Sequence, residues 1–146
     1  RSLLKSEEAQ PATKSSQPAL TENTAAGEHG AKDSQATIEY MARNCPGCSL
    51  PEADLGRADL VEAQLAGADL HGANLSMANL RRANLQKANL QKAVMAYANL
   101  PGADLRGADL RGASFKGANL IKADLTGAKL EGADLSEVLR EGVKGL

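Results

Sequence analysis

The residues of this sequence with the greatest potential for chemistry are two cysteines, two histidines and a long series of carboxylates. Cys45 and Cys48 form a single Cys-Pro-Gly-Cys motif. A structural zinc site needs four ligands, and no second cysteine pair or nearby histidine pair accompanies the motif. A thioredoxin-like redox centre is expected beside a strand–helix–strand unit, which the surrounding sequence does not contain.

Three interpretations of the cysteine pair stay open. The two side chains can be small buried residues that close the junction between a helix and the segment that follows it. They can form a disulfide, which an oxidising compartment would favour. They can also hold a metal or act in redox chemistry, for which the sequence offers the least support.

The histidines and carboxylates do not form a catalytic constellation. His29 and His71 stand far apart, and neither lies in a defined arrangement with a nucleophile or a carboxylate. The acidic residues recur at a regular interval along the chain, so we expect them to be solvated surface side chains. We therefore predict that the protein is not an enzyme and that it binds no cofactor, metal or small-molecule substrate.

The composition excludes several other classes of protein. Hydrophobic residues make up 42% of the chain, yet its aromatic residues are only Tyr40, Tyr97 and Phe115. Alanine and leucine must therefore supply most of the core. A net charge of −1 argues against a strongly basic nucleic-acid binder. The longest apolar runs are far shorter than the roughly 20 residues of a membrane-spanning helix.

A period of five residues determines the fold. Seventeen units run from Ala53-Asp54-Leu55 to Ala133-Asp134-Leu135, and each has alanine two residues before its central residue. The centre is leucine except at Met95 and Phe115, and Asp or Asn precedes it in thirteen units. A fixed period over so many residues indicates a repeat architecture. In a short extended segment, the centre and the alanine two residues earlier point to the same side.

The two residues after each centre are expected to form a corner. Eight of these corners end in glycine, and Leu100-Pro101-Gly102-Ala103 places proline and glycine where a type II turn prefers them. Corners that end in Lys, Arg, Glu, Met or Tyr are predicted to be type I-like, because those side chains disfavour positive φ.

The tandem Ala-(Asp/Asn)-Leu-x-x units closely resemble the pentapeptide-repeat family over residues 50–137. The resemblance implies a right-handed quadrilateral β-helix with four units per coil. Met95 and Phe115, 20 residues apart, would then stack on one face. Similar Cys-x-x-Cys junctions precede the repeats of other members, which implies a structural role for the motif. Some members mimic duplex DNA and block DNA gyrase.

Stacked coils leave unpaired backbone at both ends, which caps must cover. We expect a helix from Ser34 to about Asn44, with Asp33 or Ser34 as its N-cap, to cover the first end. A short helical cap containing Val138 and Leu139 is expected at the other end. The predicted organisation is a polar flexible tail at 1–33, a capping helix and Cys-x-x-Cys junction at 34–49, the β-helix at 50–137 and a C-terminal cap at 138–146.

The outward-facing positions of the repeats indicate where a partner protein could bind. With four units per coil, Met77 and Tyr97 become neighbours at one corner, and Val61, Pro101 and Ile121 follow along the same edge. The predicted partner-binding strip, rimmed also by Lys122, consists of Met77, Val94, Tyr97, Pro101, Ile121, Arg81 and Arg82. The alternative is that these apolar residues are scattered and merely tolerated at the surface.

The predicted function is a non-enzymatic interaction module or structural subunit that docks on a larger complex, with the polar tail as a second contact. Because the family occurs in the thylakoid lumen and the chain begins at Arg1, we expect a processed lumenal protein on a membrane assembly such as a photosystem. The alternative is a DNA-mimicking, gyrase-directed protein in a bacterial cytoplasm. Basic residues concentrate between Arg81 and Lys122, however, and this belt departs from the acidic surface of a DNA mimic.

Overall fold

A computed structural model describes residues 31–146 of the chain. Residues 1–30 of the predicted polar tail, with His29, lie outside the described residues. The one helix of the described part is α3, Ala31–Ala42. It begins earlier than the predicted helix over 34–44, so Asp33 and Ser34 lie within it and the prediction of either as its N-cap is wrong. It also ends earlier, because Asn44 already belongs to the first coil, where it pairs with Gln64.

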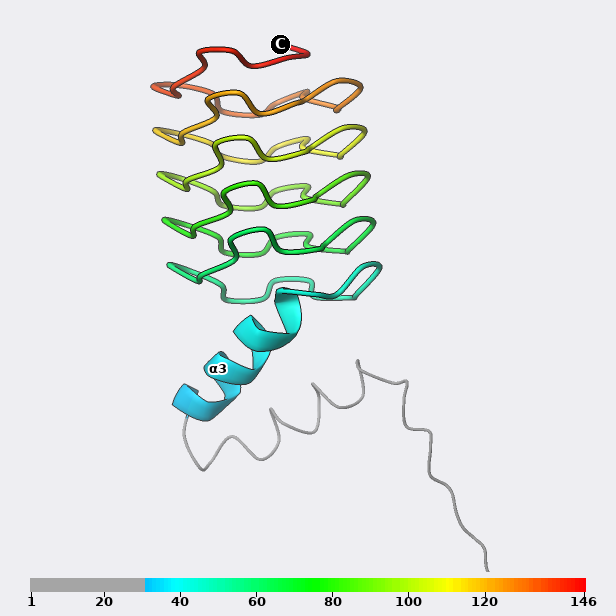
Figure 1. The fold of residues 1–146 in the computed structure, drawn as a ribbon, viewed down its shortest axis with the longest axis vertical. Coiled ribbons are helices and arrows are strands. Elements are labelled where there is room, and N and C mark those ends of the chain that lie inside the picture. Colours follow the sequence, from blue (N-terminus) through cyan, green and yellow to red (C-terminus); the bar gives the residue numbers. More distant parts are fainter. Residues whose placement is uncertain (1–30) are drawn as a thin grey trace, which may run out of the picture. The chain divides into compact units, whose positions relative to one another are not determined.

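The rest of the chain winds into coils that stack along one axis (Figure 1). Seventeen parallel backbone pairs join residues that are always 20 positions apart, from Asn44–Gln64 to Asp124–Lys144. Four five-residue units therefore complete one coil, as the resemblance implies. Residues that occupy the same position in successive coils form a column along the shaft.

Leucine and alanine fill the interior of the coils. The central leucines from Leu55 to Leu120 are fully buried, and the alanines two residues before the centres from Ala58 to Ala123 are nearly so. Met95 and Phe115 are also fully buried and lie on one face in successive coils, as predicted, because the residues before them pair with each other. No polar or charged side chain is buried among the described residues.

The corners differ from the sequence prediction. Ten residues other than glycine occupy the second corner position with φ between 57° and 62°, in the same left-handed region as the corner glycines. The prediction of type I-like turns at these corners is therefore wrong. These ten are Glu52, Arg57, Glu62, Met77, Arg82, Lys87, Lys92, Tyr97, Lys122 and Glu137.

The stacking of the coils explains why the corner conformation does not depend on residue type. The N–H of the second corner residue donates to the carbonyl of the first corner residue in the next coil, as from Tyr97 to Lys116 at 2.8 Å and from Lys92 to Arg111 at 3.0 Å. A type I turn would not present this N–H in the same way. The hydrogen bonds between coils therefore offset a cost of about 1–2 kcal/mol for each left-handed residue.

The end of α3 supplies hydrogen bonds that a preceding coil would otherwise make. The compact body of the chain begins at Ile38, so it includes this end of the helix. Glu39 Oε2 accepts the N–H of Asp59 at 2.9 Å, and Arg43 Nε donates to the Asp59 carbonyl at 3.0 Å. Glu39 stands 20 residues before Asp59, so its carboxylate replaces the carbonyl that each later coil receives from the coil before it. Among the described residues, the end of α3 therefore acts as the predicted cap on the first coil.

The C-terminal segment continues the coil instead of forming the predicted helical cap. Leu139 pairs with Asn119, and Lys144 pairs with Asp124, in the same 20-residue register as the repeats before them. Val138 and Val143 occupy alanine positions, and Gly142 has the positive φ of a second corner residue. The unit pattern thus persists in this segment although its alanines and leucines have been replaced.

The corner geometry predicts that glycine substitutions at two neighbouring positions have opposite effects. Lys92→Gly removes a left-handed non-glycine residue and should raise the free energy of unfolding by up to about 1 kcal/mol. Gln91→Gly, at the first corner position where φ is negative, should lower it by about 0.5–1 kcal/mol. Urea unfolding of both variants measures this difference. Destabilisation by both substitutions to the same extent would contradict the proposed role of the corner.

Candidate interaction surface

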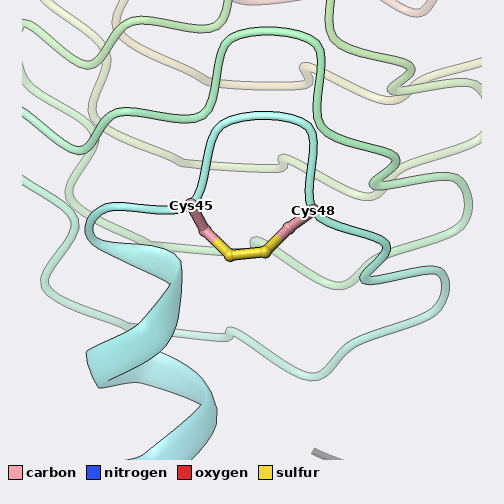
Figure 2. The surroundings of a disulfide bond; sticks show 2 residues. All are labelled: Cys45 and Cys48. Atoms are coloured by element: carbon pink, nitrogen blue, oxygen red, sulfur yellow. A yellow bond between two sulfur atoms is a disulfide. The ribbon is translucent and has the colours of Figure 1, made fainter. Parts of the chain in front are cut away.

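The structure joins Cys45 and Cys48 in a disulfide within the first coil (Figure 2). Both side chains are buried, with exposed fractions of 7% and 4%. The flanking backbone is held by the second coil, because Cys45 N–H donates to the Gln64 carbonyl at 2.8 Å and Cys48 accepts from Asp69 N–H at 2.7 Å. No group of three or more His, Cys, Asp or Glu side chains among the described residues could hold a metal ion.

The aspartates and asparagines before the centres have a structural task that sequence reasoning missed. Their Oδ1 atoms accept the backbone N–H two residues later, as Asn119 does from Ile121 at 3.0 Å and Asp69 from His71 at 3.1 Å. This bond orients the start of the corner. These side chains remain accessible to solvent, as expected, and they also stabilise the turn. The known tendency of Asp and Asn to form such Asx turns was a signal available from sequence.

Several of these carboxylates are also neutralised locally. Arg106 forms two hydrogen bonds with Asp104, at 2.9 and 2.7 Å, and Arg111 binds Asp109 in the same way at 2.8 and 2.6 Å. The hydrogen bond from the guanidinium holds the pKa of each of these two carboxyl groups below its ordinary value of 3.8. The basic belt predicted from sequence is therefore partly compensated at these two arginines.

Two further aspartates are held ionised mainly by hydroxyl groups. Asp124 accepts a hydrogen bond from the Thr126 hydroxyl at 2.6 Å, and Asp134 accepts one from Ser136 at 2.6 Å. These hydrogen bonds, first among the causes, lower the pKa of both carboxyl groups. Each of these acidic side chains thus stabilises the corner of its own five-residue unit, and the acidic side chains do not gather around a shared site.

The predicted strip is divided between two corners and two faces. Met77 and Tyr97 lie in one column at a corner, as expected. Pro101 and Ile121 lie at the next corner, in turns closed by the hydrogen bonds from Ala103 N–H to the Leu100 carbonyl and from Ala123 N–H to the Leu120 carbonyl. The prediction of a single shared edge is therefore wrong, because a flat face separates the two columns.

We call this separating surface, with its two rims, the amide face. It consists of residues 76–82, 96–102 and 116–122, which are equivalent segments of three successive coils. Asparagines occupy its middle column, at Asn79, Asn99 and Asn119. Val94, also part of the predicted strip, lies on the adjoining face, where it pairs with Ser114.

The first rim of the amide face carries two exposed apolar side chains beside Lys116. Tyr97 is 54% exposed and Met77 48% exposed. The Tyr97 ring lies over the Cα of Gly117 in the next coil, where a Cβ would collide with the ring. Gly117 therefore makes room for the ring to lie along the shaft instead of projecting from it.

Hydrogen bonding in the middle column leaves amide donors facing outward. Asn119 Nδ2 donates to Asn99 Oδ1 at 3.2 Å. Pro101 has no N–H, so Asn99 cannot form the Asx turn that Asn79 makes with Arg81. Among the described residues, the Nδ2 groups of Asn79 and Asn99 have no hydrogen-bond acceptor.

The charges on the amide face all have one sign. Its three segments contain Arg81, Arg82, Lys116 and Lys122 and no aspartate or glutamate. Arg82 contacts Glu62 of the preceding coil at 3.3 Å. The described residues provide no ion pair within 4 Å for Arg81 or Lys122, both of which are exposed.

The remaining candidates do not assemble around a common point. His71 occupies a first corner position outside the amide face and is half-buried. Tyr40 is 73% exposed on α3. None of the helices in the described part of the chain is long and apolar enough to cross a membrane.

Comparisons with known proteins agree with this geometry. A family model described as pentapeptide repeats matches residues 44–76, 74–112 and 98–137. The crystal structure of the pentapeptide repeat protein Rfr23 from the cyanobacterium Cyanothece 51142 is similar, with 30% sequence identity and a TM-score of 0.62. The match covers 80% of this chain and 96% of that chain. A comparison with curated proteins finds no match.

Two other solved structures are less similar. A pentapeptide repeat protein of the Arabidopsis thaliana thylakoid lumen has 28% identity and a TM-score of 0.36, with coverage of 72% of this chain and 64% of that chain. A trypsin-treated variant of QnrB1, a plasmid-mediated fluoroquinolone resistance protein, has 21% identity and a TM-score of 0.47. That match covers 69% of this chain and 67% of that chain.

The pairing of Asp104 with Arg106 predicts a pH-dependent contribution to stability. Asp104→Asn should keep the Asx turn, as Asn84 does with Gln86 N–H, but lose the ion pair. Because the folded-state pKa of Asp104 is lowered, wild type should be more stable at pH 7, by less than about 1 kcal/mol for so exposed a pair. The difference should shrink as the pH falls below 3.8, when the unfolded carboxyl becomes protonated.

Denaturant unfolding of wild type and Asp104→Asn between pH 2 and 7 measures this difference. Arg106→Gln provides the control background, in which Asp104→Asn should have little effect at any pH. An equal stability difference at pH 2 and pH 7 would contradict the assignment to the ion pair.

Proposed function

The chain belongs to the pentapeptide-repeat family, and from this membership and its exposed surface we propose that it is a non-enzymatic protein-interaction module. Its right-handed β-helix would act as a rigid support that presents the amide face and the adjoining Val94 to a protein partner. The observation that carries the proposal is the grouping of exposed apolar side chains. Between residues 45 and 130 of the described chain, the exposed large hydrophobic residues are Val61, Met77, Val94 and Tyr97.

These residues are grouped by the 20-residue register. Met77 and Tyr97 share one column, and Val61 precedes Arg81, Pro101 and Ile121 in the column at the opposite rim. Tyrosine, methionine and arginine are enriched at protein interfaces, and contiguous exposed apolar area favours binding. The corner N–H groups are already bonded between coils, so binding would not require the backbone at this surface to rearrange.

The distribution of charge argues against the alternative, a DNA-mimicking protein directed at gyrase. A DNA mimic requires carboxylates in continuous array along the shaft. Here Asp104 and Asp109 are paired with arginines, and Lys129 follows Asp109 in its column. An assay of gyrase supercoiling tests this alternative, and inhibition at stoichiometric concentration would revive it.

The compartment and the assembly that we propose are the thylakoid lumen and a larger membrane complex such as a photosystem. The Cys45–Cys48 disulfide supports an oxidising compartment, whereas a bacterial cytoplasm would keep the two thiols reduced. Alkylation of free thiols in intact cells distinguishes the two. Both cysteines should resist labelling until a reductant is added, and labelling without reductant would contradict the lumenal assignment.

Site-specific photo-crosslinking tests the proposed interaction. A photoreactive phenylalanine at Tyr97 should crosslink to one identifiable protein in an extract of the source cells, because this ring position faces the partner. The matched control replaces Lys92, which occupies the equivalent second corner position of the neighbouring corner with the same φ of 60°. Equal crosslinking from both positions, or none from Tyr97, would contradict the proposal.

A further inference from the structure

The amide face carries cations and no carboxylate of its own, a property that it shares with the adjoining face of Val94, whose segments 71–77, 91–97 and 111–117 also lack aspartate and glutamate. Arg111 of that adjoining face is paired with Asp109, whereas the described residues provide no ion pair for Arg81 or Lys122 of the amide face. Its 21 residues carry Arg81, Arg82, Lys116 and Lys122 and no acidic residue, although the whole chain has a net charge of −1. Outside this window carboxylates return to the equivalent segments, with Asp59 and Glu62 beside Arg57 before it and Glu137 and Glu141 beside Arg140 after it. The basic character is therefore confined to three coils.

The basic residues surround groups that are not charged. Arg81, Arg82 and Lys122 lie at one rim, whereas Lys116 lies with Met77 and Tyr97 at the other. Between them runs the asparagine column, whose Nδ2 groups at Asn79 and Asn99 lack acceptors among the described residues. Such a surface offers cations, N–H donors and an aromatic ring together, but no carboxylate as a hydrogen-bond acceptor.

This complementarity identifies a class of partner. A segment that fits must bring carboxylates for the cations, carbonyl oxygens for the amide donors and an apolar side chain for the exposed part of Tyr97. We infer that the amide face binds an acidic segment of a partner protein that contains at least one aromatic or aliphatic residue. This inference rests on the proposed interaction function and specifies the chemistry of its partner.

The chemistry favours a protein segment over a nucleic acid. Only four cations occupy the face, Arg82 contacts Glu62, and Asp104 and Asp109 occupy two of the other three faces of the basic belt. A nucleic-acid strand would depend mainly on phosphate contacts, with strong salt dependence. An acidic segment with an apolar residue also uses Met77 and Tyr97, so part of its affinity should persist at higher salt.

A fluorescent random copolymer of glutamate and tyrosine serves as the probe, with the full chain titrated in an anisotropy assay. Wild type should bind the copolymer more tightly than it binds polyglutamate of the same length. Arg81→Glu combined with Lys122→Glu should weaken copolymer binding about tenfold or more, because like charges then face the probe. Tyr97→Ser should abolish most of the preference for the copolymer over polyglutamate.

The matched control combines Lys87→Glu with Lys92→Glu. These residues are also exposed corner cations of the basic belt, but they lie at the other two corners of the coil. This double reversal should change copolymer affinity by less than about twofold, since it alters the net charge equally but leaves the amide face intact. Thermal unfolding confirms that both double variants remain folded.

Three results would overturn the inference. The first is absence of copolymer binding by wild type, and the second is equal weakening by the two charge reversals. The third is tighter binding of single-stranded DNA of equal length, which would assign the face to nucleic acid. The photo-crosslinking result is independent of this assay. Arg81→Glu and Lys122→Glu can also be tested for their effect on crosslinking from position 97. If a partner is still captured to the same extent, the inference of an acidic partner segment is refuted, but the proposed interaction function is retained.

Discussion

The hydrogen bond between corners of successive coils is the constraint on which the rest of this structure depends. At each corner, the N–H of the second residue reaches the carbonyl of the first residue one coil later, as from Lys87 to Arg106 at 2.9 Å. The bond requires a left-handed residue, sets the 20-residue register and aligns equivalent residues in columns. Burial of leucine and alanine then stabilises the stack by about 1.5–3 kcal/mol for each fully buried leucine, before the opposing loss of chain entropy.

The same constraint determines which side chains share a surface. Met77 and Tyr97 are distant in sequence, but the register makes them neighbours, and it places Gly117 where the tyrosine ring needs space. The neutral asparagine column and its basic rim arise in the same way, from segments 20 residues apart. The surface proposed to bind a partner is thus assembled by the register from corner and face residues of successive coils.

Much of this architecture could be predicted from the repeat itself. The period of five and the buried Leu and Ala positions follow from regular spacing, whereas the stacking of Met95 on Phe115 needed the four units per coil that the resemblance to the pentapeptide-repeat family implied. The corner conformation could not be deduced from single residues, because the preference of Lys or Tyr for negative φ is outweighed by bonds to the next coil. The C-terminal coil was missed because Val138 and Val143 replace alanine, although Gly142 at a second corner position was a usable signal. The rims of the amide face required the three-dimensional register.

The most direct test of the account is whether position 77 lies on position 97 in solution. Pyrene labels on Met77→Cys and Tyr97→Cys should give strong excimer fluorescence, because coils stack about 4.8 Å apart and place both labels in one column. The same labels at Met77→Cys and Lys87→Cys, at diagonally opposite corners, should give monomer emission. Excimer emission from the second pair without the first would contradict the 20-residue register, and with it the amide face.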